Sequence, residues 1–264
     1  MEYTHLRRKK NFQILLAVAS LGVLAYGAAL SCKVDFSVLQ QGIIKGIEFL
    51  GFMFPPDWQA MTEMINPAIE TVLLAFLATV FGGFLSLFFG LAAASNLSPP
   101  WLRNFSRFLL AAERSLPEII TLLLLISALG LGAFPGVIAM SIGCIGMLGR
   151  LFSDAIEEIS PATLESIESV GASRWQVIRY GVIPQVLPSL IANTIFRFEV
   201  NIRLSVLLGA VGAGGIGYEL FYSFQVLEYQ RATSAILVTL ALVFFSERVS
   251  NQLIKKLAPE AKLK

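Results

Sequence analysis

The chain has 264 residues, of which 56% are hydrophobic and only 14% are charged. Soluble domains carry about 25% charged residues, so this composition excludes an ordinary soluble protein. Only helices and closed barrels satisfy their backbone hydrogen bonds in lipid, and the apolar runs here lack the alternation of barrel strands. The composition therefore predicts an all-α polytopic membrane protein, and the net charge of +2 gives no reason to expect nucleic acid as a partner.

Residues that bind metals or perform catalysis are scarce. The only histidine, His5, lies in a polar tail, which excludes a histidine-based metal site or catalytic triad within the membrane. The two cysteines, Cys32 and Cys144, stand in different contexts and suggest no disulfide framework. We therefore expect no metal, no bound cofactor and no catalytic site in this chain.

Apolar runs of about 20 residues, the length that crosses the hydrocarbon core of a bilayer, follow one another along the chain. We predict six spans, at 12–31, 68–95, 107–129, 135–156, 189–210 and 232–250. They leave a tail at 1–11, a loop at 32–67, a polar segment at 157–188 and a tail at 251–264, with 68–250 as the core. The first run has a basic flank like that of a cleaved signal peptide, but its length and the five runs after it favour a retained anchor.

The distribution of lysine and arginine predicts which segments face the cytoplasm. With the N-terminus inside, 14 of the 20 Lys and Arg residues lie in or beside the inside segments. Only Lys33, Lys45 and Arg231 lie outside, and the other three lie within spans. Both termini and the segment 157–188 are therefore expected in the cytoplasm. In the outside loop, residues 38–54 have apolar side chains on one side, which is typical of a helix on the membrane surface.

The polar segment 157–188 has the pattern of two short helices separated by a glycine. Glu165 and Glu168 are three residues apart, so their carboxylates share one helix face. Gly171 can adopt the left-handed conformation that ends a helix and turns the chain. The pattern predicts a structured hinge, and a solvated loop is the alternative.

The helix after the glycine begins at a capping residue and is followed by prolines. Ser173 can cap this helix, and Arg174 follows in its first turn. Pro184 and Pro188 are expected to stop the helix and to restart the chain into the span 189–210. This order of helix, glycine, helix and proline favours the structured hinge over the solvated loop.

The fifth predicted span carries Arg197, Glu199, Asn201 and Arg203 within seven residues. Each charge at the bilayer centre costs about 2.5–3.5 kcal/mol on insertion scales. Glu199 and Arg203 are spaced to pair along one helix face, whereas Arg197 and Asn201 share another. Either the arginines line a pathway and attract an oxyanion through their planar forks, or the charges form ion pairs that lock helices together.

The third predicted span carries Glu113, Arg114 and Glu118 around Pro117. A proline inside a helix kinks it and frees a backbone carbonyl. We expect these charges to pair with the fifth span, either as part of a pathway or as a structural contact.

A glycine-rich stretch follows the fifth span, with Gly212, Gly214, Gly215 and Gly217. It matches the dinucleotide-binding pattern G-x-G-x-x-G, but it follows a membrane helix and no βαβ unit surrounds it, which excludes a nucleotide site. These glycines predict a flexible outward turn, where helices pack closely or a gate bends.

Several of these motifs, in order, resemble those of ATP-binding-cassette (ABC) importer permeases over about residues 54–250. The stretch Glu165–Ile178 with Pro184 resembles their cytoplasmic "EAA" loop, although Glu165-Ser166-Ile167 stands where Glu-Ala-Ala is usual. That opening is typical of the phosphonate-type branch. Further marks of the branch are Arg114-Ser-Leu-Pro-Glu118, Tyr180-Gly-Val-Ile-Pro-Gln-Val-Leu-Pro188, Arg197-Phe-Glu-Val-Asn-Ile-Arg203 and Gly209-Ala-Val-Gly-Ala-Gly-Gly-Ile-Gly-Tyr-Glu219.

The resemblance implies a type I ABC importer permease fold with a role for each segment. The implied coupling helix, which docks to a cytoplasmic ABC ATPase dimer, comprises Glu165, Glu168, Gly171, Ala172 and Arg174. The implied translocation pathway comprises Arg197, Glu199, Asn201, Arg203, Arg114 and Glu118. The implied extracytoplasmic gate comprises Gly212, Gly214, Gly215 and Gly217. The chain would work as a homodimer in the bacterial inner (plasma) membrane, with an extracytoplasmic solute-binding protein.

The chain contains no phosphate-binding loop ending in Gly-Lys-Ser/Thr, so ATP and Mg²⁺ are expected on the partner ATPase. The predicted function is import of phosphonate or a related phosphorus oxyanion, phosphite or phosphate. A permease for a different small solute, an ion-coupled secondary transporter and a membrane enzyme remain as alternatives. A secondary transporter needs no docking helix, and the chain offers no convincing catalytic constellation.

Overall fold

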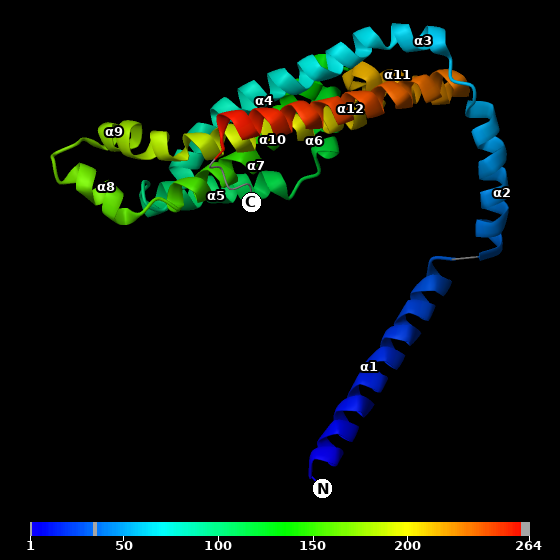
Figure 1. Cartoon of the computed structure of the whole chain (residues 1–264), viewed down its shortest axis with the longest axis horizontal. Helices are drawn as coiled ribbons and strands as arrows, with labels where there is room; N and C mark the ends of the chain where they lie inside the picture. Colours follow the sequence, from blue (N-terminus) through cyan, green and yellow to red (C-terminus); the bar gives the residue numbers. More distant parts are fainter. Residues whose placement is uncertain (1, 34–35, 260–264) are drawn as a thin grey trace. The chain divides into compact units, whose positions relative to one another are not determined.

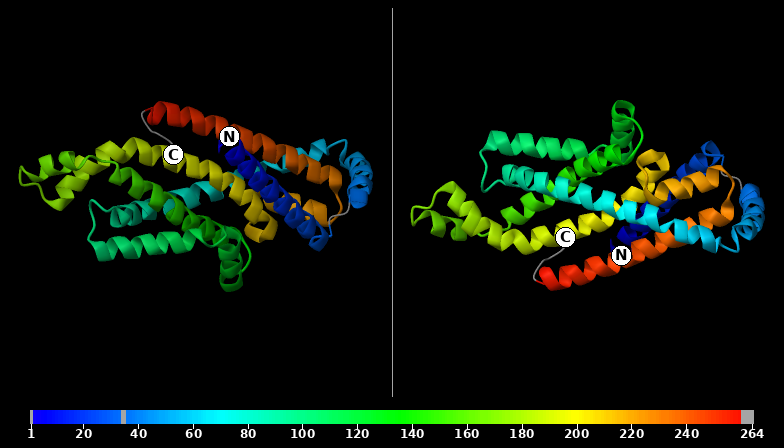
Figure 2. Two further views of the ribbon diagram at one scale, coloured as in Figure 1. Left: turned by 90° about the horizontal axis from the view of Figure 1, so that it is seen from below. Right: turned by 90° about the horizontal axis from the view of Figure 1, so that it is seen from above.

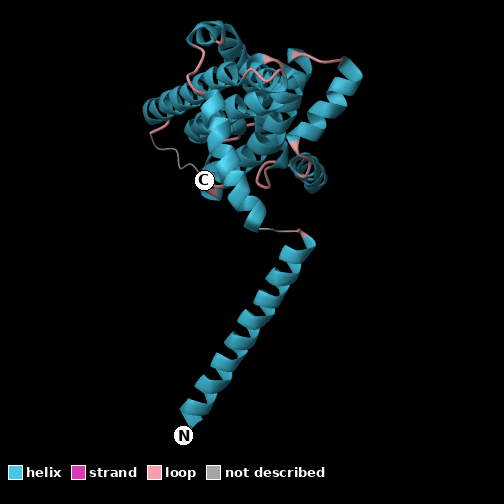
Figure 3. Cartoon of the chain, turned by 90° about the vertical axis from the view of Figure 1, so that its right-hand side faces the viewer, coloured by secondary structure: helices cyan, strands magenta, loops and turns pink. Residues whose placement is uncertain are grey.

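The computed structural model describes residues 2–33 and 36–259, and throughout these residues the chain is helix joined by turns (Figure 3). Two compact units are present, Met1–Phe52 and Met53–Lys264. Long apolar runs form helices because a helix satisfies its backbone polar groups internally. The all-α prediction is confirmed.

The N-terminal unit is built from α1 (Glu2–Ser31) and α2 (Phe36–Met53). Within α1, Gln13–Ser31 is long and apolar enough to cross a membrane, and it coincides with the first predicted span. The second helix, α2, covers the predicted surface helix at 38–54. Its position on a membrane surface stays a prediction.

The larger unit is a bundle of long helices with short helices at both ends. Its elements are α3 (Trp58–Glu63), α4 (Ile65–Ala93), α5 (Pro100–Arg114), α6 (Glu118–Leu129), α7 (Ala133–Glu157), α8 (Pro161–Glu168), α9 (Arg174–Gln176), the π-helical η1 (Val177–Val182), α10 (Ile183–Leu208), the π-helical η2 (Gly209–Ala213), α11 (Gly215–Gln225) and α12 (Tyr229–Leu257). Helices α8 and α9 project at one end of the bundle, and α3 and α11 lie at the other (Figure 1). The same arrangement is visible from two other directions in Figure 2.

The packing of α4 against α7 depends on glycines. A Cβ at Gly82 would lie 2.3 Å from Cys144 Cβ, and one at Gly90 would lie 2.7 Å from Phe152 Cβ. Helices in membranes approach closely where small residues replace bulky ones, because van der Waals contact supplies much of the attraction. Residues 144–156 of α7 accordingly contribute to the largest buried cluster of the unit.

Within the described residues, four helices are long and apolar enough to span a membrane, or five if one bent pair counts as a single span. The four are Gln13–Ser31, Trp58–Ala93, Ala133–Glu157 and Tyr229–Leu257, and the bent pair is Arg174–Ala213 with Gly215–Gln225. They coincide with five of the six predicted spans. The remaining one, 107–129, is not a continuous helix.

The kink predicted at Pro117 is a full break between α5 and α6. The N–H of Ser115 bonds to Ala111 O and that of Leu116 bonds to Glu113 O, which closes the last turn of α5. Pro117 itself is extended, with φ −60° and ψ 133°. Because proline has no N–H and disfavours helical backbone in the residue before it, the chain restarts as a separate helix.

The prediction that Pro184 and Pro188 stop a helix is wrong. The chain is helical without interruption from Arg174 to Ala210, and the helix is broken only after that, at Val211 and Gly212. Pro184 lies in the first turn of α10 and Pro188 lies inside it. Ahead of them, η1 is a π-helical segment. Its wider turn shifts the hydrogen-bond register, so the helix continues across Pro184, which lacks an N–H.

Candidate functional site

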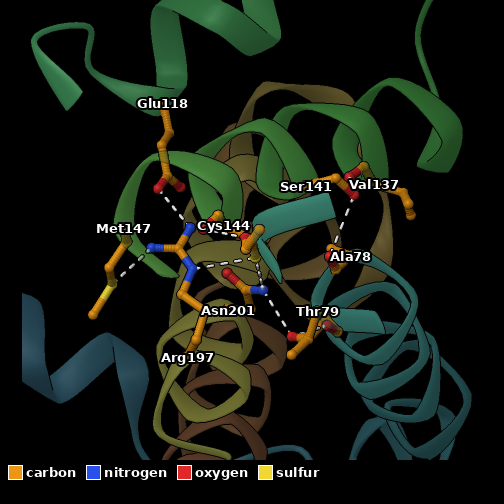
Figure 4. Close-up of polar contacts among 11 residues, drawn as sticks. Ala78, Thr79, Glu118, Val137, Ser141, Cys144, Met147, Arg197 and Asn201 are labelled. Carbon is orange, nitrogen blue, oxygen red and sulfur yellow. Dashed lines mark hydrogen bonds and ion pairs between the residues drawn. The ribbon is translucent and has the colours of Figure 1, made fainter. Parts of the chain in front are cut away.

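A buried arginine of α10 joins two other helices (Figure 4). Arg197 is only 4% exposed, and its Nη2 donates to Glu118 Oε1 of α6 at 2.7 Å. Its Nε and Nη1 donate to two sulfur atoms of α7, Cys144 Sγ at 3.3 Å and Met147 Sδ at 3.4 Å. A charge this deeply buried is tolerated because it is paired and its N–H groups have acceptors.

One turn further along α10, Asn201 extends the same network to α4. Its side chain is fully buried, and Nδ2 donates to Thr79 Oγ1 at 2.8 Å and to Cys144 Sγ at 3.1 Å. Cys144 thus accepts from both Arg197 and Asn201, which confirms that these two residues share a helix face. Among the described residues, Asn201 Oδ1 has no hydrogen-bond partner. This face is an inter-helix contact, which favours a locking role for Arg197 and Asn201.

Two glycines of α7 make room for the carboxylates of the third predicted span. A Cβ at Gly143 would lie 2.4 Å from Glu118 Oε1, and one at Gly146 would lie 1.4 Å from Glu113 Oε2. Both carboxylates therefore reach the surface of α7 only because side chains are missing there. The expected pairing of third-span charges with the fifth span is confirmed for Glu118.

The second predicted pair of α10, Glu199 with Arg203, is not part of the Arg197 network. Arg203 Nη2 bonds to Glu199 Oε1 one turn away, which confirms this pairing. The Glu199 side chain is 8% exposed, whereas that of Arg203 is 48% exposed. Arg203 is therefore the charged group of α10 that remains open to a ligand or to another chain.

Arg114 belongs to neither pair. It lines a cavity of about 370 Å³ together with Met147, Arg150, Leu151, Asp154, Asn193 and Phe196. The six pathway candidates from the sequence thus lie in three places, namely the Arg197 network, the Glu199–Arg203 pair and this cavity. The sequence alone does not point to Cys144 or Arg150 as site residues. A lone cysteine has no recognisable pattern, and Arg150 at the inside end of a predicted span contributes only to the orientation of the chain in the membrane.

The glycine-rich turn is strained in the way that only glycine tolerates. Gly212, Gly214 and Gly215 have φ values of 99°, 86° and 70°. In this left-handed region a side chain is strained against the backbone, so glycine is favoured. A Cβ at Gly217 would lie 1.9 Å from Val206 O, so the backbone of α11 lies directly against α10. The predicted close-packed turn is confirmed, and the helices on its two sides are bent by 54°.

The α8–α9 segment has the predicted helix–glycine–helix form. Gly171 has φ 81° and its N–H donates to Glu168 O at 2.9 Å, which ends α8. Ser173 precedes α9, and its N–H donates to the side chain of Gln176 at 2.7 Å. Glu165 and Glu168 are exposed, and no ion pair between described residues involves them.

One face of α8 is anchored to the bundle and the other is open. Leu164 is buried, and Ile167 packs so closely on η1 that a Cβ at Gly181 would lie 2.6 Å from Ile167 Cδ1. Ala172 packs against the same cluster. Outside it, Val170 and Trp175 are strongly exposed. The segment is an anchored projection with two exposed carboxylates and exposed apolar groups.

Known proteins share this architecture. In solved structures the chain resembles a subunit of the inward-facing MetNI methionine ABC transporter, with TM-score 0.68 and 20% identity over 76% of this chain and 99% of that one. It also resembles a chain of a bacterial ABC transporter for the polysaccharide alginate, with TM-score 0.60 and 19% identity over 90% and 99%. At these identities the likeness concerns the fold.

Comparison of sequences finds relatives with higher identity than these solved structures have. The chain is 34% identical to the putative phosphite transport system permease protein HtxC of Stutzerimonas stutzeri, over 94% of this chain and 87% of that protein. It is 36% identical to the phosphite transport system permease protein PtxC of the same organism, over 84% and 81%. It is 38% identical to the phosphate-import permease protein PhnE of Mycolicibacterium smegmatis, over 78% of this chain and 39% of that protein.

The family model of the binding-protein-dependent transport system inner membrane component matches residues 86–259, which contain the α8–α9 segment, the glycine turn and all of the Arg197 network except Thr79. The chain therefore belongs to this family, the inner-membrane permeases of ABC transporters, and is a multi-pass inner-membrane protein.

Proposed function

We propose that the chain is the membrane permease of an ATP-driven importer for phosphonate, phosphite or phosphate, and that it works as a homodimer. The observation that carries the proposal is the α8–α9 segment. It presents Glu165 and Glu168 on a short helix whose other face is fixed to the bundle through Leu164. A rigid, anchored helix transmits a push from a docked protein, and its acidic face can pair with basic groups there.

The substrate class rests on the relatives. Two similar permeases are named for phosphite and one for phosphate, and together they match most of this chain. A half-exposed arginine, Arg203, suits such a substrate because a guanidinium binds two oxygens of one tetrahedral anion at once. A permease for another small solute is the alternative, since D-methionine permeases are also similar, for example at 29% identity over 62% of this chain.

Each chain has one coupling segment, and this number supports a second copy of the permease as a partner. Two ATPase subunits need two such segments, which supports two copies of the permease. ATP and Mg²⁺ would be bound by the ATPase pair, and this chain would bind no cofactor. A solute-binding protein on the outer side would release the anion into a space between the two permeases, from which it leaves inward.

The coupling role is tested by reversing the two charges, Glu165→Lys together with Glu168→Lys. We expect the ATPase to be lost from the complex when the tagged permease is purified. The matched control is Glu247→Lys, which reverses an exposed charge on α12. If the ATPase still co-purifies with the double variant and transport continues, the coupling role is lost.

The driving force and the substrate are tested in proteoliposomes that contain the permease, its ATPase and its binding protein. Uptake of phosphite or methylphosphonate should require ATP inside and the binding protein outside. Uptake that follows an ion gradient without ATP would favour a secondary transporter. Uptake of D-methionine in place of the phosphorus oxyanions would favour the permease for another solute.

A further inference from the structure

The cavity between α5, α7 and α10 contains charged groups that belong neither to the Arg197 network nor to the Glu199–Arg203 pair. Its residues on α7, from 147 to 154, lie in the C-terminal part of that helix, which leads directly into α8. The cavity therefore lies toward the end of the bundle that carries the α8–α9 segment. If that segment faces the cytoplasm, a substrate passes this level last.

Two arginines and one aspartate line this cavity. Arg150 and Asp154 form a two-point pair, with Nη2–Oδ1 at 2.9 Å and Nε–Oδ2 at 3.2 Å. The Arg150 side chain is nevertheless 41% exposed. Arg114 is exposed, and no ion pair between described residues involves it. The lining residues thus carry a net positive charge, while Glu113, which lies outside the lining, interacts with Arg114 through space without forming an ion pair.

We propose that this cavity is a weak binding site for a tetrahedral phosphorus oxyanion leaving the permease, bound by Arg114 and Arg150, with Asp154 as an internal competitor for Arg150. The inference rests on the proposed function and adds a site to it. A phosphonate dianion can bond to both guanidinium forks, and the volume of about 370 Å³ leaves room for water around it.

Asp154 explains why such a site would be weak. Its carboxylate occupies the Nε–Nη2 edge of the Arg150 guanidinium, which is one of the two edges that a phosphonate could use. An entering anion must displace that carboxylate or share the guanidinium with it, and both lower the affinity. A transport pathway needs weak sites, because an anion that binds tightly on the way does not leave.

The cavity also adjoins the buried network of α10. Met147 lines the cavity, and its Sδ accepts a hydrogen bond from Arg197 at 3.4 Å. Arg197 itself is engaged by Glu118, so an anion in the cavity meets Arg114 and Arg150 first. Arg197 therefore has a structural role, and Arg114 and Arg150, which are more exposed, are available to bind the anion.

The test uses the full chain in nanodiscs of neutral phosphatidylcholine, with methylphosphonate as the probe. Binding is measured by saturation transfer to the methyl protons of the probe, with phosphite and inorganic phosphate as competitors. Arg114→Gln and Arg150→Gln should each weaken binding about tenfold, since each removes a charge-assisted pair of hydrogen bonds. Asp154→Asn should tighten it several-fold, a gain that a misfolded chain cannot give. Arg103→Gln, which changes an arginine of the same helix α5 that does not line the cavity, is the matched control and should change nothing.

The results of this experiment distinguish a transported oxyanion from a phospholipid headgroup as the ligand of the cavity, since both present phosphate oxygens. If anionic phospholipid in the nanodisc abolishes binding of the probe and Asp154→Asn does not tighten it, the cavity is a headgroup site and the inference is overturned. Equal binding by the two arginine variants and the parent chain overturns it as well. Because the measurement needs neither ATPase nor binding protein, its failure is distinct from a failure of the assembled importer to take up phosphorus oxyanions.

Discussion

Arg197 Nη2 lies 2.7 Å from Glu118 Oε1, although the two residues are 79 positions apart in the chain. The contact joins α10 to α6 across the surface of α7, where Gly143 leaves space for the carboxylate. Two residues that were expected to face a substrate are therefore bonded to each other. Their first role is to hold the broken third segment against the bundle.

Removing the carboxylate charge should reveal this role. Glu118→Gln leaves Arg197 buried without its counter-charge, so the free energy of unfolding should fall by about 2–3 kcal/mol. The measurement is unfolding of the purified chain in detergent by titration with sodium dodecyl sulfate. Transport, normalised to the amount of assembled permease, should change little.

The double variant Glu118→Gln with Arg197→Met is the control for this prediction. It removes both charges and leaves an apolar chain of similar length, so it should recover part of the lost stability. A Glu118→Gln chain that is as stable as the parent but fails to transport would contradict the locking role and favour a pathway role.

The sequence predicted five of the six spans, the two polar faces of α10 and the left-handed glycine at 171, because spacing and residue type alone determine these features. It did not predict the uninterrupted helix at Pro184, since a π-helical turn depends on tertiary packing. It also could not predict Cys144 as the acceptor of both Arg197 and Asn201. That role arises only when α7 lies against α10.

The unusual Ile167 in the coupling segment has a structural explanation that one sequence could not supply. Its Cδ1 occupies the space next to Gly181, where a larger residue would clash. An isoleucine at this place in α8 and a glycine in η1 therefore belong together. At this departure from Glu-Ala-Ala, Ile167 packs against the bundle, and Glu165 on the other face of α8 stays exposed.

Adjacent glycines of α4 offer a matched test of helix packing. A Cβ at Gly82 would lie 2.3 Å from Cys144 Cβ and 2.7 Å from the backbone oxygen of Ser141, neither of which can turn away. Gly82→Ala should therefore destabilise the chain by about 1–3 kcal/mol. At Gly83 the nearest atoms are 3.8 Å away, so Gly83→Ala should be neutral or gain up to about 1 kcal/mol of helix propensity. Unfolding in detergent checks both, and equal effects would mean that α4 and α7 can separate at no cost.

Gly130 and Gly214 have the same φ of 86°, so a comparison of their alanine variants can distinguish the effect of backbone strain from an effect on a gate. Gly214 lies in the turn before α11, and Gly130 lies between α6 and α7. Alanine should cost about 1–3 kcal/mol of stability at either place, because both need the left-handed region. At Gly214 the new Cβ would also lie 2.7 Å from Glu70 Oε1, at the end of a flexible side chain, whereas at Gly130 nothing lies within 4 Å. If the turn before α11 is the gate, ATP-driven uptake should fall in Gly214→Ala far more than in Gly130→Ala. Equal loss of uptake would mean that the strain, and not the turn, limits transport.

Arg203 is the remaining candidate for contact with the substrate from α10. Its side chain is 48% exposed, so Arg203→Gln should leave the chain folded and assembled while uptake of phosphite falls by about tenfold. Accumulation in the membrane and size-exclusion chromatography check folding, and uptake into proteoliposomes checks function. A chain that fails to accumulate would show that Arg203 is a structural lock.

A second variant separates substrate contact from neutralisation of Glu199, whose side chain is only 8% exposed. If Arg203 only supplies a counter-charge, the double variant Glu199→Gln with Arg203→Gln has no buried charge left to compensate and should transport normally. If Arg203 binds the anion, the double variant should stay as impaired as Arg203→Gln alone. Glu199→Gln by itself frees the guanidinium from its carboxylate, so it should lower the substrate concentration needed for half-maximal uptake. We expect the second pattern, because half of the Arg203 side chain is open to a ligand whereas its carboxylate partner is not.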